Sequence, residues 1–478
     1  MGRCRDYDVC GLDDGADPAA GCCILHSPRP DKESRAFLEA LQAHRRTRGD
    51  NFTRMVFPVS VDLGAAPLGT AFFNGAVFLQ ACDFTGVTCA DAVFFHGASF
   101  RAEAIFTLAT FTHSCTFSRA RFEGPAEFHG ASFQGSADFS GATFRESADW
   151  SEALFAGEAS FAGLSLGAAT FRGVTFAGPA EFQEALFRGR PSFQRTRFVQ
   201  GASFSAAAFP EGAEFQEAAF EGGPASFAGA RFGGRTQFGA RCEGEQRILA
   251  FAGTEADFRG VRVAEPGGLV FREADLRRCR FLDSEAERID CARTLWPTVA
   301  GRDSRLGVRD EQAAGDQPEG EQPWGELELL YRRLAQGAVR AGERERAGDF
   351  RYGEMEMRRR NPATPRSTRR LLLAYAVLAG YGERFLRPLL FALLLWLSAA
   401  VGYLALGLVS ATGGLPLDPG QGGDWLRALH FSLGAMTLAA PWDLVAIGQA
   451  RGLQIIQHLL GPLLLALLVQ GVWRRIGR

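Results

Sequence analysis

A phenylalanine that returns every five or six residues, from Phe73 to Phe238, constrains the fold of this chain more than any other feature. A small residue, most often Ala, stands two positions before most of these rings. The spacing fits neither the 3.6-residue period of a helix nor the alternation of a half-buried strand. One small and one large inward residue per step instead predict a chain that turns a corner every few residues, as the coils of a solenoid do.

Four such steps close one coil of about 22 residues, and coils stack about 4.8 Å apart, which predicts a rod of about 45 Å. Cys89 and Leu166 take two of the ring positions. Gly-Pro pairs at 124–125, 178–179 and 223–224 fall in the six-residue steps, where corners are expected. We place the solenoid at residues 72–296, after a lead-in at 49–71.

The repeat resembles the pentapeptide-repeat family, whose motif is A-(D/N)-L/F-x-x. That resemblance implies a right-handed quadrilateral β-helix, although the six-residue steps depart from the strict motif. Some members of the family resemble duplex DNA and have strongly acidic rods. Here arginines balance the outward acids such as Asp138 and Glu214, and the net charge of the chain is only −2. We therefore expect a solvated face and no nucleic-acid partner.

The N-terminal segment contains four candidate metal ligands, Cys4, Cys10, Cys23 and His26. The C-x-x-H spacing of the last two lets both side chains reach one ion, and three thiolates with one imidazole would make a closed, structural zinc site. Cys22 is a spare thiol. The alternative is a set of free thiols in an unstructured terminus. Residues 1–48 are thus expected to form a zinc-knuckle-like segment, followed by a helix over 31–48 that caps the first coil.

Residues 297–323 are polar and aperiodic, which predicts a linker. Residues 324–362 show helical spacing of apolar residues and predict two amphipathic connector helices in a hairpin. The phrase AGDFRYGEMEMRRR at the end of this region resembles a connector in bacterial pentapeptide-repeat membrane proteins. Its acids lie among arginines, so an ion-paired surface is expected.

Two apolar stretches, 389–409 and 453–473, are each long enough to cross a lipid bilayer. A shorter apolar stretch at 368–383 is expected to lie along the interface. The arginines concentrate on the far sides of the pair, at Arg384, Arg387, Arg474 and Arg475. The positive-inside rule therefore predicts an α-helical two-span domain with both termini in the cytosol. The resemblance of the connector implies that the membrane is a bacterial inner membrane.

Between these spans, residues 425–447 are apolar but too short to cross, which predicts a re-entrant segment. Irregular backbone at that depth is tolerated only inside protein or beside water, so oligomerisation around an axis is implied. The stretch ALHFSLGAMTLAAPWDLV resembles the pore helix and filter of two-span tetrameric cation channels, with Phe431, Ser432, Thr437 and Asp443 in register. The resemblance implies a filter at Thr437, Leu438, Ala439, Ala440, Pro441, Trp442 and Asp443.

A potassium filter needs Gly-Tyr/Phe-Gly, which Ala440, Pro441 and Trp442 replace, so potassium selectivity is not expected. The Gly-Tyr-Gly at 380–382 precedes the first span and cannot be a filter by position. Three residues of the second span are gating candidates: His458, Gly461 and Pro462. His458 is a functional candidate because it is ionisable within a span, the alternative being an interfacial hydrogen bond. Gly461 and Pro462 predict a kink.

The leading hypothesis is an oligomeric, ion-channel-like membrane protein, expected to be a tetramer, whose cytosolic solenoid senses a protein or small ligand. The alternative is a membrane-anchored scaffold that binds a soluble protein without conduction. An enzyme is not expected, because the sequence has no P-loop, G-x-S-x-G or H-E-x-x-H motif.

Overall fold

The computed structural model describes residues 2–17, 19–62, 68–266, 268–299, 305–318, 321–413, 415–439, 441 and 443–476. The chain divides into two compact units, Met1–Gln322 with Gln336–Glu343, and Pro323–Ala335 with Arg344–Arg478. The first unit contains the phenylalanine repeat, and the second contains the apolar helices. Helix α4 (Trp324–Arg340) contributes residues to both units.

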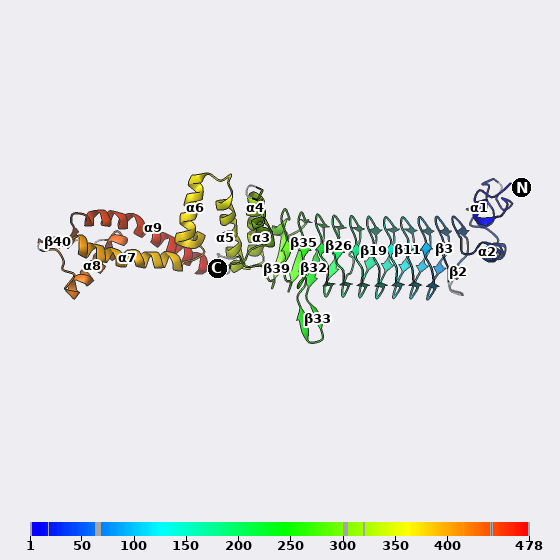
Figure 1. Ribbon diagram of the computed structural model, residues 1–478, viewed down its shortest axis with the longest axis horizontal. Helices are drawn as coiled ribbons and strands as arrows, with labels where there is room; N and C mark the ends of the chain where they lie inside the picture. The colour runs from blue at the N-terminus through cyan, green and yellow to red at the C-terminus, as the bar shows by residue number, and fades with distance from the viewer. Residues whose placement is uncertain are drawn as a thin grey trace. The chain divides into compact units, whose positions relative to one another are not determined.

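The phenylalanine repeat folds as a β-solenoid of two-residue parallel strands stacked coil upon coil, as Figure 1 shows. One ladder of ten strands runs from β1 (Val56–Phe57) to β36 (Arg262–Val263), and another runs from β3 (Ala71–Phe72) to β38 (Cys279–Arg280). A third face holds seven strands, from β6 (Thr88–Cys89) to β29 (Ala219–Phe220). The predicted β-solenoid is confirmed.

The fourth face holds a six-stranded ladder, β2 (Val61–Asp62) to β21 (Ala169–Thr170), and a four-stranded ladder, β28 (Glu214–Phe215) to β39 (Ile289–Ala292). Bridges from Thr170 to Ser192 and on to Glu214 join these two ladders. Equivalent side chains, such as those of Ser114 and Ser136, lie 22 residues apart and hydrogen-bond across neighbouring coils. The coil therefore has the length that the spacing predicted.

Rings stack in columns along the inside of the coils. The ring of Phe95 lies 4.7 Å from that of Phe73 and 4.6 Å from that of Phe117, nearly parallel to both. It meets the ring of Phe106, in the next column, edge-on at 5.8 Å. Offset stacks and edge-on contacts are the arrangements that aromatic pairs prefer, so each ring is held both along and across the rod. Small inward residues such as Ala104, which is fully buried, leave room for them.

Cys89 and Leu166 do take ring positions, because they pair in register with Phe111 and Phe144. The first coil begins at Val56, before the expected start at residue 72. Phe52 and Phe57 lie five residues apart and already stack on the rings one coil on, at 4.7 and 4.6 Å. Residues 56–62 of the expected lead-in thus belong to the solenoid, and the Phe spacing there was the signal for this.

Helix α2 (Ser34–Arg48) lies within the predicted helix and packs on the first coil. The ring of Phe37 meets that of Phe57 edge-on at 5.8 Å. His44 donates a hydrogen bond from Nε2 to the carbonyl of Asn51 over 2.7 Å. The helix therefore covers apolar rings that the end of a solenoid would otherwise expose, and short helix α1 (Tyr7–Cys10) precedes it.

The expected linker contains a buried helix, α3 (Arg309–Gly315). The carboxylate of Asp310 accepts the backbone N–H groups of Phe281, at 2.8 Å, and Leu282, at 3.3 Å. These amides directly follow β38, which is the last strand of its ladder among the described residues. The polar composition suggested a solvated linker because it does not reveal that a carboxylate here satisfies buried amides.

An antiparallel hairpin of β33 (Arg241–Glu243) and β34 (Gln246–Ile248) projects from the side of the solenoid (Figure 1). The phenylalanine spacing did not predict it, because it is an insertion between two ring positions. Its strands are mostly exposed, so the hairpin adds little to the core.

The second unit begins with the expected helical hairpin of α4 and α5 (Arg344–Arg360). A Cβ at Gly353 would lie 2.5 Å from the ring of Tyr331, so only glycine allows this buried ring to lie against α5. Arg332 pairs with Glu354 across the hairpin over 2.8 Å. The charged residues of this region therefore form ion pairs, as the sequence suggested.

The remaining elements of this unit are α6 (Arg366–Ala379), η2 (Gly380–Gly382), α7 (Leu386–Leu406), β40 (Leu408–Ser410), α8 (Gly422–Met436), β41 (Leu444–Ala446) and α9 (Ala450–Ile476). Helices α7 and α9 lie side by side, and α8 packs against both (Figure 1). Mean hydropathy reaches 2.3 in α7 and 1.8 in α9, with 28% and 22% of those windows buried. By length and composition, both helices could cross a membrane.

Candidate functional site

The four predicted metal ligands, Cys4, Cys10, Cys23 and His26, converge at one buried point in the N-terminal segment. Their ligand atoms all lie within 4.8 Å of one another. Cys10 is the last residue of α1, which brings it back toward Cys4. Cys23 and His26 belong to one tight turn, in which the N–H of His26 donates to the carbonyl of Cys23 over 3.1 Å.

Three of the six separations between these atoms already match those around one tetrahedral ion. Sγ of Cys23 lies 3.3 Å from Nδ1 of His26 and 3.7 Å from Sγ of Cys10. Sγ of Cys4 lies 3.7 Å from the same imidazole nitrogen. Zinc bonds of about 2.3 Å to sulfur and about 2.0 Å to nitrogen place tetrahedral ligand atoms about 3.3–3.8 Å apart. The cluster could therefore hold a metal ion once its more distant ligand atoms, up to 4.8 Å apart, draw together around it.

Surrounding groups orient the ligands. Nε2 of His26 lies 3.1 Å from the carbonyl of Thr53, which accepts its hydrogen and leaves the Nδ1 lone pair for an ion. Sγ of Cys4 accepts the N–H of Cys23 at 3.3 Å, and Sγ of Cys10 accepts that of Leu12 at 3.4 Å. Amide donors of this kind stabilise thiolates, the form in which cysteine binds metal.

Burial opposes charge in this cluster. It raises the pKa of the Cys10 and Cys23 thiols and lowers the pKa of the His26 imidazole. A divalent cation is the usual means by which buried thiolates are kept charged. Cys22 lies outside the four ligands, and its thiol donates to the carbonyl of Ala20 over 3.3 Å.

Helix α8 begins beside the C-terminal end of α7 and runs alongside both apolar helices toward their interior. Ala428 and Phe431 pack with Tyr403, near the end of α7. Met436, the last residue of α8, packs with Ala392 and Leu464, well inside α7 and α9. A helix rises 1.5 Å per residue, so the α8 terminus, beside Ala392, lies about 21 Å along α7 from the end of that helix at Leu406.

After α8, the chain runs back toward the C-terminal end of α7, beside which α8 began. The N–H of Ala411 donates to the carbonyl of Asp443 over 2.8 Å. Strands β40 and β41 pair antiparallel just beyond α7 and just before α9, with Ser410 opposite Leu444. The chain between α7 and α9 thus runs along both apolar helices as α8 and comes back toward the end of α7; that this segment is a re-entrant loop in a bilayer stays a prediction.

The candidate filter residues lie on this returning segment. Thr437, Leu438, Ala439 and Asp443 are exposed and Pro441 is partly buried, whereas Ala440 and Trp442 lie outside the described residues. Leu438 has a φ of 59°, a left-handed conformation that a branched side chain rarely adopts. This strained position ends α8 and turns the chain back, which the sequence did not indicate.

A buried polar network joins the three helices. The hydroxyl of Tyr403 donates to Oε1 of Gln457 over 2.8 Å, and Nε2 of Gln457 donates to Oγ of Ser432 over 2.9 Å. Ser432 in turn donates to the carbonyl of Trp396 over 2.8 Å. In the sequence, Gln457 is a polar residue within the apolar stretch 453–473. Its polarity in an apolar helix was the available signal for this network.

The three gating candidates have different surroundings. His458 is partly buried, and its Nε2 atom is buried without a hydrogen-bond partner among the residues that the structure describes. A Cβ on Gly461 would lie 2.4 Å from the carbonyl of Met436, so glycine is required where α8 ends against α9. Helix α9 continues through Pro462. Gly461 therefore has a packing role, while hinge motion at this point stays a prediction.

The Gly-Tyr-Gly at 380–382 lies at the start of α7 and belongs to another cluster. Tyr381 has a φ of 57° and donates from its hydroxyl to Glu356 over 3.0 Å. Burial alone would raise the pKa of Glu356, but hydrogen bonds and charge from Arg359 and Arg360 outweigh it and lower the pKa to about 2. A permanently charged carboxylate thus ties α5 to the turn between α6 and α7.

Gln457→Leu is expected to lower the stability of the helical unit by about 1–3 kcal/mol, because the Tyr403 hydroxyl loses its acceptor inside the bundle. Thermal denaturation of the detergent-solubilised protein measures this effect. Gln454→Leu, one helical turn earlier at a partly buried position, is the matched control and should change stability little. Equal shifts from both substitutions would contradict the assigned network.

Comparison with known families bears on the solenoid. The family model described as Pentapeptide repeats (9 copies) matches residues 73–121, 117–164 and 166–208. No curated protein and no solved structure matched the chain. The fold and the repeat together define a pentapeptide-repeat solenoid, as the resemblance implied. The chain thus carries a pentapeptide-repeat domain together with two helices that are apolar enough to cross a membrane.

Proposed function

We propose that the protein is an oligomeric, pore-loop cation channel of a bacterial inner membrane, with its solenoid in the cytosol as a sensor of a protein or small ligand. The observation that carries this proposal is the path of residues 422–446. They descend along α7 and α9 as a helix and return as a short segment to the β40–β41 pair. Acidic Asp443 lies at the end of the returning segment, where a cation would meet it.

Exposed surface around this loop supports an oligomer. Leu426 and Leu459 are each 70% exposed, on α8 and α9. The returning backbone beside Leu438 is irregular, and such backbone at membrane depth must be shielded by protein or line water. Identical chains packed around an axis would bury the apolar faces and leave the returning segments facing a shared pore. Tetrameric symmetry is our proposal for the assembly.

The connector helices offer a mechanical link. Tyr381 and Glu356 join α5 to the turn that begins α7, and Gly461 brings α9 against the end of α8. A displacement of α5 would thus act on α7, and a displacement of α9 would act on the pore helix. We propose that ligand binding to the solenoid opens the pore through these two contacts.

We further propose that the ion of the N-terminal cluster is zinc. Three sulfur ligands and one imidazole nitrogen are a soft donor set that favours zinc over magnesium or calcium. All four positions of a tetrahedron are filled by side chains, so the role is structural. The ion would hold residues 4–26 together beside the first coil.

Single-channel recording in planar bilayers tests conduction by the full-length protein. We expect cation currents whose unitary conductance falls in Asp443→Asn, because the substitution removes negative charge at the mouth of the pore. Asp418→Asn is the matched control, since Asp418 is also exposed and its role as acceptor for the N–H of Gly420 survives in asparagine. Absence of current in the bilayer, together with cross-linking that detects only monomers or dimers, would contradict the proposal and favour the membrane-anchored scaffold.

A further inference from the structure

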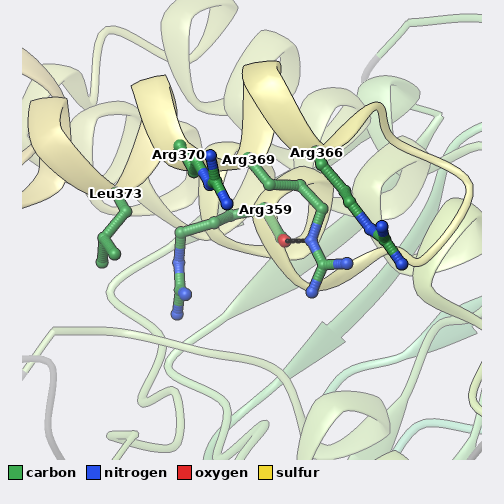
Figure 2. A pocket seen from close by; sticks show the side chains of 5 residues that line it. All are labelled: Arg359, Arg366, Arg369, Arg370 and Leu373. Atoms are coloured by element: carbon green, nitrogen blue, oxygen red, sulfur yellow. Dashed lines mark hydrogen bonds between the residues drawn. The ribbon is translucent and has the colours of Figure 1, made fainter.

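A basic cavity of about 220 Å³ lies where α5 ends and α6 begins, apart from the metal cluster and the loop. It is lined by Arg359, Arg366, Arg369, Arg370 and Leu373. In Figure 2 the guanidinium groups of Arg366 and Arg369 extend from α6 to the same side as that of Arg359 from α5. The end of α5 and the start of α6 thus direct several guanidinium groups into one cavity.

The positive charge of this cavity is only partly compensated. Arg359 pairs with Glu356, with contacts of 2.6 and 3.0 Å. Among the residues that the structure describes, no ion pair involves Arg366, Arg369 or Arg370. Guanidinium groups gathered without carboxylates repel one another, and a bound anion would relieve that repulsion. The cavity is therefore suited to a group with negative charge.

The shape of the donors favours phosphate. Nε of Arg369 donates to the carbonyl of Arg359 over 3.0 Å, which fixes the position of this guanidinium relative to α5. Planar guanidinium groups bind phosphate oxygens through paired N–H donors. Arg366 and Arg370 are exposed on the first turns of α6 and can close around a phosphate from the solvent side.

Apolar side chains next to the cavity indicate where the phosphate comes from. Leu373 lines the cavity and is 49% exposed, and Val377, one turn further along the same face of α6, is also 49% exposed. Basic groups beside exposed apolar side chains on one helix are typical of segments that lie in the headgroup region of a membrane. A soluble anion would not need this apolar border, whereas an acyl chain would contact it.

We propose that this cavity binds the phosphate of an anionic phospholipid, with the acyl chains of the lipid along Leu373 and Val377, which lie one turn apart on α6. The inference rests on the proposed membrane insertion of α7 and α9 and is independent of conduction. The lipid would tie α5 and α6 together at the surface of the membrane. A protein that conducts no ions but still binds the anionic lipid preferentially would contradict the proposed channel function and support the proposed lipid site.

Native mass spectrometry of the detergent-solubilised, full-length protein tests the site with two lipids of identical acyl chains, phosphatidylglycerol and phosphatidylcholine. We expect phosphatidylglycerol to bind more tightly. Arg366→Gln with Arg370→Gln should weaken its binding about 30-fold, because each basic group near an anionic surface contributes about fivefold. Arg351→Gln with Arg358→Gln is the matched control, since both arginines are exposed on α5 outside the cavity, and should change binding by less than about threefold, within the usual scatter of surface substitutions.

Equal binding of the two lipids by the unmodified protein would overturn the proposal without reference to any variant. Unchanged selectivity in Arg366→Gln with Arg370→Gln, with an unaltered melting temperature, would overturn it as well. Inorganic phosphate forms a separate arm of the experiment. If it alone displaces phosphatidylglycerol at millimolar concentration, the cavity binds a free anion and the lipid assignment is wrong.

Discussion

Replacing Cys23 by serine is expected to abolish zinc binding and open the N-terminal segment. Cys23 is the central ligand, because its sulfur contacts both Cys10 and His26. Structural zinc contributes about 10–16 kcal/mol in small domains at pH 7, so the loss is larger than that of any single packing contact. Zinc content per chain, measured by atomic emission, should fall from one to near zero.

Cys22→Ser is the control for this experiment. Cys22 is the adjacent thiol and is also buried, but its sulfur donates to the carbonyl of Ala20 and lies outside the four-residue cluster. This variant should keep its zinc. Limited proteolysis supplies a second readout, since the segment before α2 should be cleaved rapidly in Cys23→Ser alone. Full zinc content in Cys23→Ser would refute the assigned ligand set.

Phe95→Ala is expected to destabilise the coils around it by about 3–5 kcal/mol, the usual cost of emptying a buried aromatic position. The ring of Phe95 is 1% exposed and stacks on rings in both neighbouring coils. Solenoid coils depend on their neighbours, so the damage should spread locally and then fade along the rod. Hydrogen exchange of the amides between Phe73 and Phe117 should speed up by about 100- to 1,000-fold.

The preceding residue provides a control with the same change of side chain. Phe94 lies on the outer surface of the same coil, is only partly buried, and stacks on Phe72 at 5.2 Å. Removal of a cross-strand aromatic pair on an exposed face costs about 0.2–1 kcal/mol. Phe94→Ala should therefore change exchange rates by less than about tenfold. Comparable effects from the two substitutions would contradict inward packing as the source of stability.

Much of this fold was predictable because the solenoid repeats one local solution. Each coil needs one large and one small inward residue per side, so periodicity alone identified the strands and the ring positions held by Cys89 and Leu166. The start at Val56 and the helix α3 were missed for a related reason. They lie where the repeat ends, and there specific contacts, such as that of Asp310 with the amide of Phe281, replace the periodic pattern.

The candidate sites also contain a part that the sequence predicted and a part that it did not. Spacing within one turn is a local property, so Cys23 and His26 could be paired from the sequence, and the residue types suggested the other two ligands. The network of Gln457, Ser432 and Tyr403 forms where three helices meet. The spacing of residues along the chain does not predict which helices pack together.

The sequence by itself determined the solenoid, the four candidate metal ligands and the two apolar helices, since each follows from residue type and period along the chain. Only the tertiary structure decided that Gly461 is needed beneath Met436, that Leu438 turns left-handed, and that arginines from α5 and α6 share one cavity. These features depend on the distance between segments far apart in the chain, and that distance is set by packing.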